Sequence, residues 1–147
     1  METTFSQIEV GAEYSSVGRT VTEADIVNFA GCTGDFNSLH MDDVWVRENT
    51  PFPGRIAHGL LVLSIGEALR VHGIDTWKVI AFLEVQRKMV GYVLPGDRIS
   101  QKYRVASKKP SSKDPSRGVV EVEITTINQR GETVQSGYDR YLIGGPN

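Results

Sequence analysis

The sequence predicts an α+β fold in which consecutive antiparallel strands surround one buried helix. Two observations support this prediction. From residue 79 onward the chain reads as strands separated by turns, with no helical pattern between them. Residues 58–71 are apolar around most of the helical circumference, which is typical of a covered helix. A doubly wound parallel sheet would need a helix after each strand, so it is disfavoured.

The composition is that of a single globular domain over residues 1–147. Charged residues make up 23% of the chain and the net charge is −2, which gives no general attraction to nucleic acid or to an anionic membrane. No apolar run approaches the roughly 20 residues that span a bilayer. Residues 1–5 have neither a basic nor an apolar stretch, so we expect no secretion signal. The only cysteine, Cys32, is expected to be a small buried apolar residue, and the low cysteine content favours a cytoplasmic location.

The helices are expected in the first half of the chain. After a weak strand at 14–21, Thr22 and Asp25 form the pattern of an N-terminal capping box. The helix that begins there should end near residues 31–34, because glycine favours chain reversal. The elements expected next are a polar loop (35–43), a short helical turn (44–47) and the buried helix (58–71).

The strands are expected in the second half. Alternating or β-branched runs predict strands at 79–89, 98–106, 119–127 and 133–143, with turn residues at 95–97 and 128–132. Segment 108–118 holds four basic residues, two prolines and three serines, and it cannot bury an apolar face. We therefore expect it to be a mobile surface loop.

Known phosphate-binding, nucleophile-elbow and zinc-protease motifs are absent from the sequence. Only three histidines are present, His40, His58 and His72, so a metal site would need carboxylate ligands as well. We expect no metal and no redox cofactor.

One polar segment places Asp35, Asn37 and His40 within six residues, directly after the first helix. If the loop curls, Asp35 and His40 converge on one point. Such a pair could hold one water, remove a proton from it and return a proton elsewhere, because imidazole titrates near neutrality.

A second segment, Ala57-His58-Gly59, leads into the apolar helix. The first N–H groups of a helix lack internal partners and lie at the positive end of its dipole. Glycine also lets a ligand approach the backbone closely. This arrangement suits a carbonyl oxygen that becomes an oxyanion. Together the two segments fit addition of water to an α,β-unsaturated thioester.

These residues resemble the MaoC-like dehydratases, or R-specific enoyl-CoA hydratases. The family pattern G-D-x-N-P-[LIV]-H-x-D is matched by Gly34, Asp35, Asn37, Leu39, His40 and Asp42, and its second motif, [AV]-H-G, is matched by Ala57, His58 and Gly59. The turn at 95–97 also resembles the family's strand connection. The resemblance extends from about residue 22 to residue 137.

The resemblance implies a hot-dog fold, an antiparallel sheet wrapped around a central helix. It further implies that Asp35 and His40 share the catalytic water and that the Gly59 N–H binds the thioester oxygen. Asn37 would hold the loop or contact the substrate. His58 is assigned to the substrate site as well, although hydrogen bonding that only holds the helix entry is the simpler interpretation. Coenzyme A would enter only as part of the substrate. Members are usually homodimers, with the site at the subunit interface.

The sequence departs from the family at two positions. Ser38 replaces the usual proline, and Glu67 stands where some members carry a serine on the central helix. A carboxylate near an acyl pocket is costly unless it is paired or neutralised. Glu67 could face solvent, face a partner or recognise a polar acyl group.

Several alternatives stay open. The segment 51–54 faintly resembles a motif of acyl-carrier-protein dehydratases but lacks their histidine. A thioesterase or a non-catalytic acyl-CoA-binding protein would also fit the fold. Asp42 reads as a helix N-cap. The basic residues of segment 108–117, with Arg87 and Lys88, could meet coenzyme A phosphates, although a solvated surface is the simpler interpretation.

Overall fold

Antiparallel pairing organises the chain into one sheet in the order β1-β4-β5-β6-β3, with β2 also paired to β4. The computed structural model describes residues 1–146. The strands are β1 (Glu13–Ser15), β2 (Arg19–Thr20), β3 (Val79–Met89), β4 (Arg98–Pro110), β5 (Gly118–Ile127) and β6 (Thr133–Ile143). The predicted α+β class and the four long strands are confirmed.

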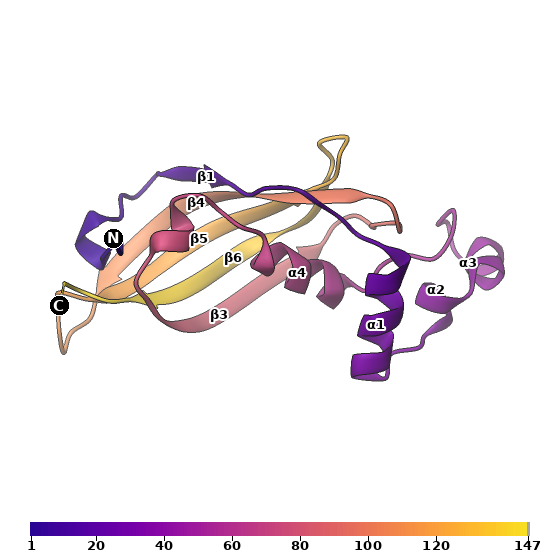
Figure 1. Cartoon of the computed structure of the whole chain (residues 1–147), viewed down its shortest axis with the longest axis horizontal. Coiled ribbons are helices and arrows are strands. Elements are labelled where there is room, and N and C mark those ends of the chain that lie inside the picture. Colours follow the sequence, from indigo (N-terminus) through magenta and orange to yellow (C-terminus); the bar gives the residue numbers. More distant parts are fainter. Residues whose placement is uncertain (147) are drawn as a thin grey trace.

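The helices are α1 (Glu23–Thr33), α2 (Ser38–Met41), α3 (Asp43–Asn49) and α4 (Gly59–Ala68), with short 3-10 turns at Phe5–Gln7 and Ile74–Thr76. In Figure 1, α4 lies against the sheet, whereas α1, α2 and α3 gather beyond one end of it. Residues of α4 form one core cluster with Ile99 of β4 and Val134 of β6. A second cluster, which includes Trp77, Val105 and Val122, fills the other end of the sheet.

The start and end of α1 follow the predicted local chemistry. Thr22 accepts a hydrogen bond from the Asp25 N–H at 3.1 Å, and the Asp25 carboxylate accepts one from the Thr22 N–H at 2.8 Å. Gly34 ends the helix with φ of 81°, a left-handed conformation that glycine adopts without strain. The prediction for Cys32 is wrong: its side chain is exposed, because it lies on the outer face of the last turn.

Helix α4 ends at Ala68, three residues before the predicted end, and it is covered on one side only. Leu61, Val62 and Ile65 are buried, but Leu60 is 62% exposed. Ser64 and Ala68 continue this exposed stripe at a spacing of four residues, which is one face of a helix. In the single chain, one face of α4 is therefore exposed to solvent instead of packed against the protein.

The predicted loop 108–118 is shorter than expected. Strand β4 continues to Pro110 and β5 begins at Gly118, which leaves 111–117 as the connection. The Lys108 ammonium donates to the carbonyls of Phe5 and Ile8, at 2.7 and 2.8 Å. These contacts with the N-terminal segment fix residues that sequence patterning alone assigns to the loop. In Figure 1 this connection lies at the end of the sheet opposite to α1, α2 and α3.

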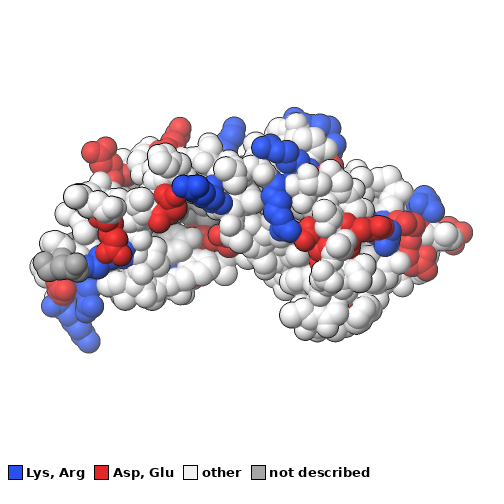
Figure 2. Space-filling view, in the orientation of Figure 1, with Lys and Arg blue, Asp and Glu red and all other residues white. Residues whose placement is uncertain are grey.

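Within residues 1–146, no helix has both the length and the apolar character needed to cross a membrane. Figure 2 shows acidic and basic side chains interspersed on the visible face rather than gathered into one patch of a single sign.

Candidate active site

The segment after α1 contains a helix that the sequence did not predict. The Asn37 side chain accepts a hydrogen bond from the Leu39 N–H at 2.9 Å and caps the single-turn helix α2. Asp42 then caps α3 by accepting from the N–H groups of Val44 and Trp45. Its predicted role as an N-cap is confirmed. The turn made by α2 brings His40 back toward Asp35.

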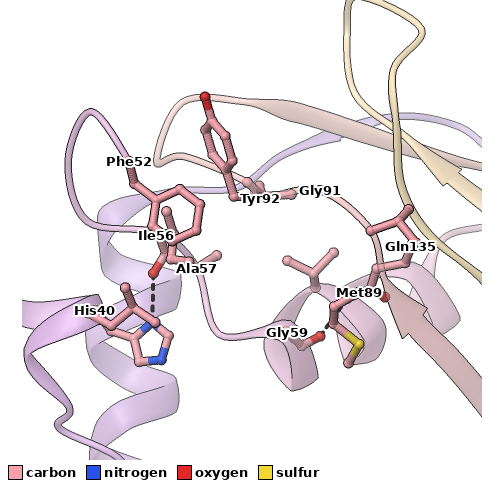
Figure 3. Close-up of a pocket in the computed structure, with 13 residues that line it drawn as sticks. His40, Phe52, Ile56, Ala57, Gly59, Met89, Gly91, Tyr92 and Gln135 are labelled. Atoms are coloured by element: carbon pink, nitrogen blue, oxygen red, sulfur yellow. Dashed lines mark hydrogen bonds between the residues drawn. The ribbon is translucent and has the colours of Figure 1, made fainter. Parts of the chain in front are cut away.

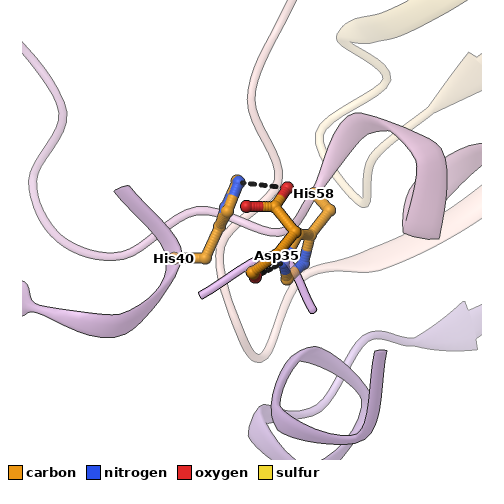
Figure 4. A group of neighbouring side chains, drawn as sticks. All are labelled: Asp35, His40 and His58. Carbon is orange, nitrogen blue, oxygen red and sulfur yellow. Dashed lines mark hydrogen bonds and ion pairs between the residues drawn. The ribbon is translucent and has the colours of Figure 1, made fainter. Parts of the chain in front are cut away.

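Asp35 and His40 face each other in the folded chain, with 3.9 Å between Asp35 Oδ2 and His40 Nε2 (Figure 4). The imidazole is nearly buried, whereas the carboxylate is 52% exposed. His40 Nδ1 lies 2.8 Å from the Ile56 carbonyl oxygen. A carbonyl can only accept, so Nδ1 donates, and in the neutral form of the ring Nε2 has a free lone pair. That lone pair is on the side of Asp35.

His58 contacts both of these residues. It is 3% exposed, and its Nε2 lies 3.0 Å from the main-chain oxygen of Asp35. Its ring stacks on the ring of His40, with 3.8 Å between centroids and 26° between planes. The polar contact of His58 is with the Asp35 backbone, which agrees with the expectation that it holds the helix entry by hydrogen bonding. Its assignment to substrate binding stays a prediction.

A cavity of about 520 Å³ lies beside this group, and its lining is mostly apolar. The residues that line it are Leu39, His40, Phe52, Ile56, Ala57, Gly59, Val62, Met89, Val90, Gly91, Tyr92, Val93 and Gln135. Figure 3 shows His40 on one side of the cavity and Gly59, Met89 and Gln135 on the other. Of the predicted site residues, His40 and Gly59 reach the cavity wall. Asp35 and His58 adjoin His40 without lining the cavity, and the Asn37 side chain caps α2.

Gly59 is the first residue of α4, so its N–H has no acceptor within the helix. A Cβ at this position would lie 2.9 Å from Met89 Cγ, so any larger residue narrows the cavity between α4 and the Met89 side chain. The side-chain amide of Gln135, in β6, donates to the Gly59 carbonyl at 2.7 Å. This hydrogen bond attaches the first turn of α4 to the sheet. The sequence did not predict a role for Gln135, because a single polar residue in a strand does not indicate which distant residue it contacts.

Asp35, His40 and His58 place potential metal-ligand atoms within 4.8 Å of one another. One ring nitrogen of each histidine is engaged with a main-chain oxygen, His40 Nδ1 with that of Ile56 and His58 Nε2 with that of Asp35, so each ring has one nitrogen left for a ligand. The absence of a metal stays a prediction.

Glu67 belongs to a buried ionic cluster between α4 and the sheet. The Arg87 guanidinium donates to Glu67 at 2.5 Å and to Asp139 at 2.8 Å. The side chains of Arg87 and Asp139 are 1% and 0% exposed. Burial and the neighbouring Asp139 carboxylate raise the pKa of Glu67 to about 7. Arg87 was expected on a solvated surface or at the coenzyme A phosphates, but its side chain is buried and its guanidinium is paired with two carboxylates inside the protein.

Apolar side chains are exposed along β3, which is an edge strand of the sheet. Those at 43% exposure or more are Val79, Ile80, Phe82, Leu83, Val85 and Met89. Leu60 of α4 adds to the exposed apolar residues. Long apolar edge strands readily pair with another chain.

The sequence matches the family described as "MaoC like domain" over residues 5–128. Among curated proteins it is 36% identical over 96 residues to Protein MaoC of Klebsiella aerogenes, covering 65% of this chain and 28% of that protein. It is 35% identical to a 3-hydroxybutyryl-CoA dehydratase of Methylorubrum extorquens, covering 44% of this chain and 40% of that one. It is 39% identical to an (R)-specific enoyl-CoA hydratase of Rhodospirillum rubrum, covering 39% and 38%. The chain thus spans less than half the length of each of these relatives.

Solved structures agree over nearly the whole chain. A structure called monoamine oxidase regulatory protein, from Archaeoglobus fulgidus, is 34% identical, has a TM-score of 0.88, and is matched over 99% of this chain and 97% of that chain. A Mycobacterium tuberculosis protein described as a double hot-dog fold is 19% identical with a TM-score of 0.80, over 99% of this chain and 45% of that one. The second likeness concerns the fold alone. The predicted hot-dog fold is confirmed.

Proposed function

Because this chain belongs to the family of MaoC-like domains, we propose that it catalyses the reversible hydration of 2-enoyl-CoA thioesters to 3-hydroxyacyl-CoA thioesters, with R stereochemistry. One observation carries the proposal: the free lone pair of His40 Nε2 and the Asp35 carboxylate face each other beside a cavity whose other wall begins at Gly59. The names of the curated relatives support this reaction class.

The separation of Asp35 and His40 suits one bridging water. A water that donates both of its protons in hydrogen bonds of about 2.8 Å places its two acceptors about 4.4 Å apart. Asp35 Oδ2 and His40 Nε2 are both acceptors and stand 3.9 Å apart. Such a water keeps its oxygen lone pairs free to attack C3 of the enoyl group.

The reaction then proceeds within this pair of residues. The water oxygen bonds to C3, an O–H bond of the water breaks, and the proton passes to Asp35 or His40. The electrons of the C2–C3 double bond move toward the thioester oxygen, where the Gly59 N–H stabilises the developing charge. A proton from the same pair is then delivered to C2. Dehydration follows these steps in reverse.

The proposed chemistry needs no metal or redox cofactor, since it consists of addition of water to C3, proton transfers and one oxyanion contact, with no change in overall oxidation state. Coenzyme A takes part only as the thiol of the substrate. The mostly apolar cavity suits the acyl group, while Glu67 is held by Arg87 and lies outside the lining of the cavity. We also retain the prediction of a cytoplasmic location.

We further propose that two copies of the chain form a homodimer through β3 and the exposed face of α4. The support is the apolar edge strand together with Leu60, which a second copy would cover. Met89 belongs to both this surface and the cavity wall. A second copy would therefore close the open side of the cavity.

The decisive experiment is incubation with a panel of trans-2-enoyl-CoA thioesters, followed by chiral analysis of the products. The expected result is (R)-3-hydroxyacyl-CoA. Release of free thiol would indicate a thioesterase, and faster turnover of matched carrier-protein thioesters would indicate the carrier-protein enzyme. Binding of a saturated acyl-CoA without hydration of any enoyl thioester would contradict catalysis.

A further inference from the structure

His58 occupies the point where three parts of the active site meet. It is the residue that precedes α4, so it is joined directly to Gly59. Its side chain is buried and points away from the cavity lining toward Asp35 and His40. A buried histidine in this place has a defined set of contacts, which can be assigned one by one.

The first contact holds the loop of Asp35. The main-chain oxygen of Asp35 accepts from His58 Nε2 at 3.0 Å, across 23 residues of sequence. The other contacts of Asp35 are local: its N–H donates to Thr33 at 3.3 Å, and its carboxylate accepts from the Asn37 N–H at 3.3 Å. His58 therefore ties the exposed loop that carries the carboxylate to the buried start of α4.

The second contact holds the ring of His40. Its edge is fixed by the Ile56 carbonyl through Nδ1, and its face is covered by the ring of His58 at a centroid distance of 3.8 Å. Phe29 of α1 packs on His58 at 4.9 Å. The ring of His40 is thus limited in both rotation and tilt, which keeps Nε2 directed at Asp35.

The proton position of His58 follows from its partners. Because a carbonyl accepts only, Nε2 of His58 carries the proton. Nδ1 is then a bare acceptor, and it has no hydrogen-bond partner among the described residues. Buried polar atoms are normally paired. The orientation of the ring therefore satisfies its contacts with Asp35 and His40 but leaves Nδ1 of His58 without a hydrogen bond.

We infer that His58 is a positioning residue, which sets the distance between the Asp35 carboxylate and His40 Nε2 through one hydrogen bond and one stacking contact. The inference rests on the proposed hydration reaction. Reacting groups lose about 100-fold in rate when they are misplaced by about 1 Å. His58 itself touches neither substrate nor water in this assignment.

Two substitutions separate the two contacts. In His58→Gln, the amide nitrogen can still donate to the Asp35 carbonyl, but the stacked ring is lost. In His58→Phe, a ring remains but the donor is lost. We expect kcat to fall about tenfold in His58→Gln and about 100-fold in His58→Phe. We expect KM for trans-2-butenoyl-CoA to stay within about threefold of the wild type. The exposed His72→Gln is the matched control and should change neither constant.

A measurement that does not depend on turnover tests the same inference. Nitrogen-15 chemical shifts of the His40 ring should show one protonated and one bare nitrogen in the wild type. In His58→Gln the Ile56 hydrogen bond remains, but the face of the ring is no longer covered, so the signals of the His40 ring should shift and broaden. If the wild type hydrates no thioester but the shifts behave in this way, the proposed reaction fails and the positioning role stands.

Three results would overturn the inference. One is a kcat within about twofold of the wild type in both variants. Another is a loss confined to KM, which would place His58 in substrate binding. The third is an unchanged His40 spectrum in His58→Gln. If His58→Phe does not fold, His58→Gln decides the outcome, because its smaller polar side chain needs no additional space.

Discussion

Asp35 Oδ2 and His40 Nε2 lie 3.9 Å apart although the two residues are five positions apart in the sequence. The short helix α2 turns the chain between them, and its cap is the Asn37 side chain. An extended segment of the same length would hold the two side chains roughly 16 Å apart. The local turn therefore creates the pair on which the proposed reaction depends.

Replacing either member of this pair should abolish most of the activity. In Asp35→Asn and His40→Ala we expect kcat for trans-2-enoyl-CoA hydration to fall at least about 100-fold, because proton transfer to a positioned group contributes about that much or more. Steady-state kinetics measures the loss, and circular dichroism checks the fold. The matched control is Asp42→Asn, since asparagine caps helices well and Asp42 only caps α3. Wild-type rates in both site variants would contradict the assignment.

Substitution of Gly59 should harm binding more than folding. The Cβ of Gly59→Ala would come within 2.9 Å of Met89 Cγ, but Met89 is flexible and 49% exposed, so it can move. We expect a melting temperature near the wild-type value and at least about a tenfold loss of kcat/KM, because the methyl group narrows the approach to the N–H. Gly31→Ala in α1 meets no atom within 4 Å and serves as the control. Unchanged kinetics in Gly59→Ala would remove Gly59 from the oxyanion site.

The raised pKa of Glu67 predicts a pH-dependent stability. In the folded protein Glu67 keeps its proton up to about pH 7, whereas in the unfolded chain it releases it near 4.5. The folded state thus binds more protons in this interval, and the free energy of unfolding falls as pH rises through it. Glu67→Gln removes the ionisation. The melting temperature of Glu67→Gln minus that of the wild type should therefore increase as pH rises from 4.5 to about 7.

Thermal melts of the two proteins over this pH range test the expectation. Glu48→Gln, on the exposed surface of α3, controls for the loss of one carboxylate. Parallel pH curves for wild type and Glu67→Gln would show that the Arg87 ion pair, rather than burial and Asp139, governs the ionisation of Glu67.

A charge on the edge strand should separate the proposed dimer. Leu83 is 52% exposed on β3, and Leu83→Lys would place an ammonium group in the covered surface. Light scattering after size-exclusion chromatography should show a monomer, and hydration should be reduced because the cavity stays open. Val10→Lys, at 57% exposure away from β3, should leave the mass unchanged. A monomeric wild type would contradict the homodimer.

Where local chemistry determines structure, the sequence predicts it well. Helix ends are predicted correctly because a cap depends only on residues within one turn. Thr22 and Asp25 begin α1, Gly34 ends it, and Asp42 begins α3. The alternation of apolar and polar residues in β5 correctly predicts which side chains are buried, namely Val120, Val122 and Ile124. The spacing of Asp35, Asn37 and His40 identifies the polar group, because these residues meet within one short loop.

Contacts between distant segments were decided by the tertiary structure. Glu67, Arg87 and Asp139 lie on three different elements, and only the register of β3 with β6 brings the last two together under α4. Gln135 reaches Gly59 across 76 residues. The last residues of β4 are held by Lys108, whose ammonium group donates to the Phe5 carbonyl near the N-terminus. Strand alternation states which side a residue faces, but not which neighbour it meets there. That choice follows from strand order and register, which arise only when the whole sheet is formed.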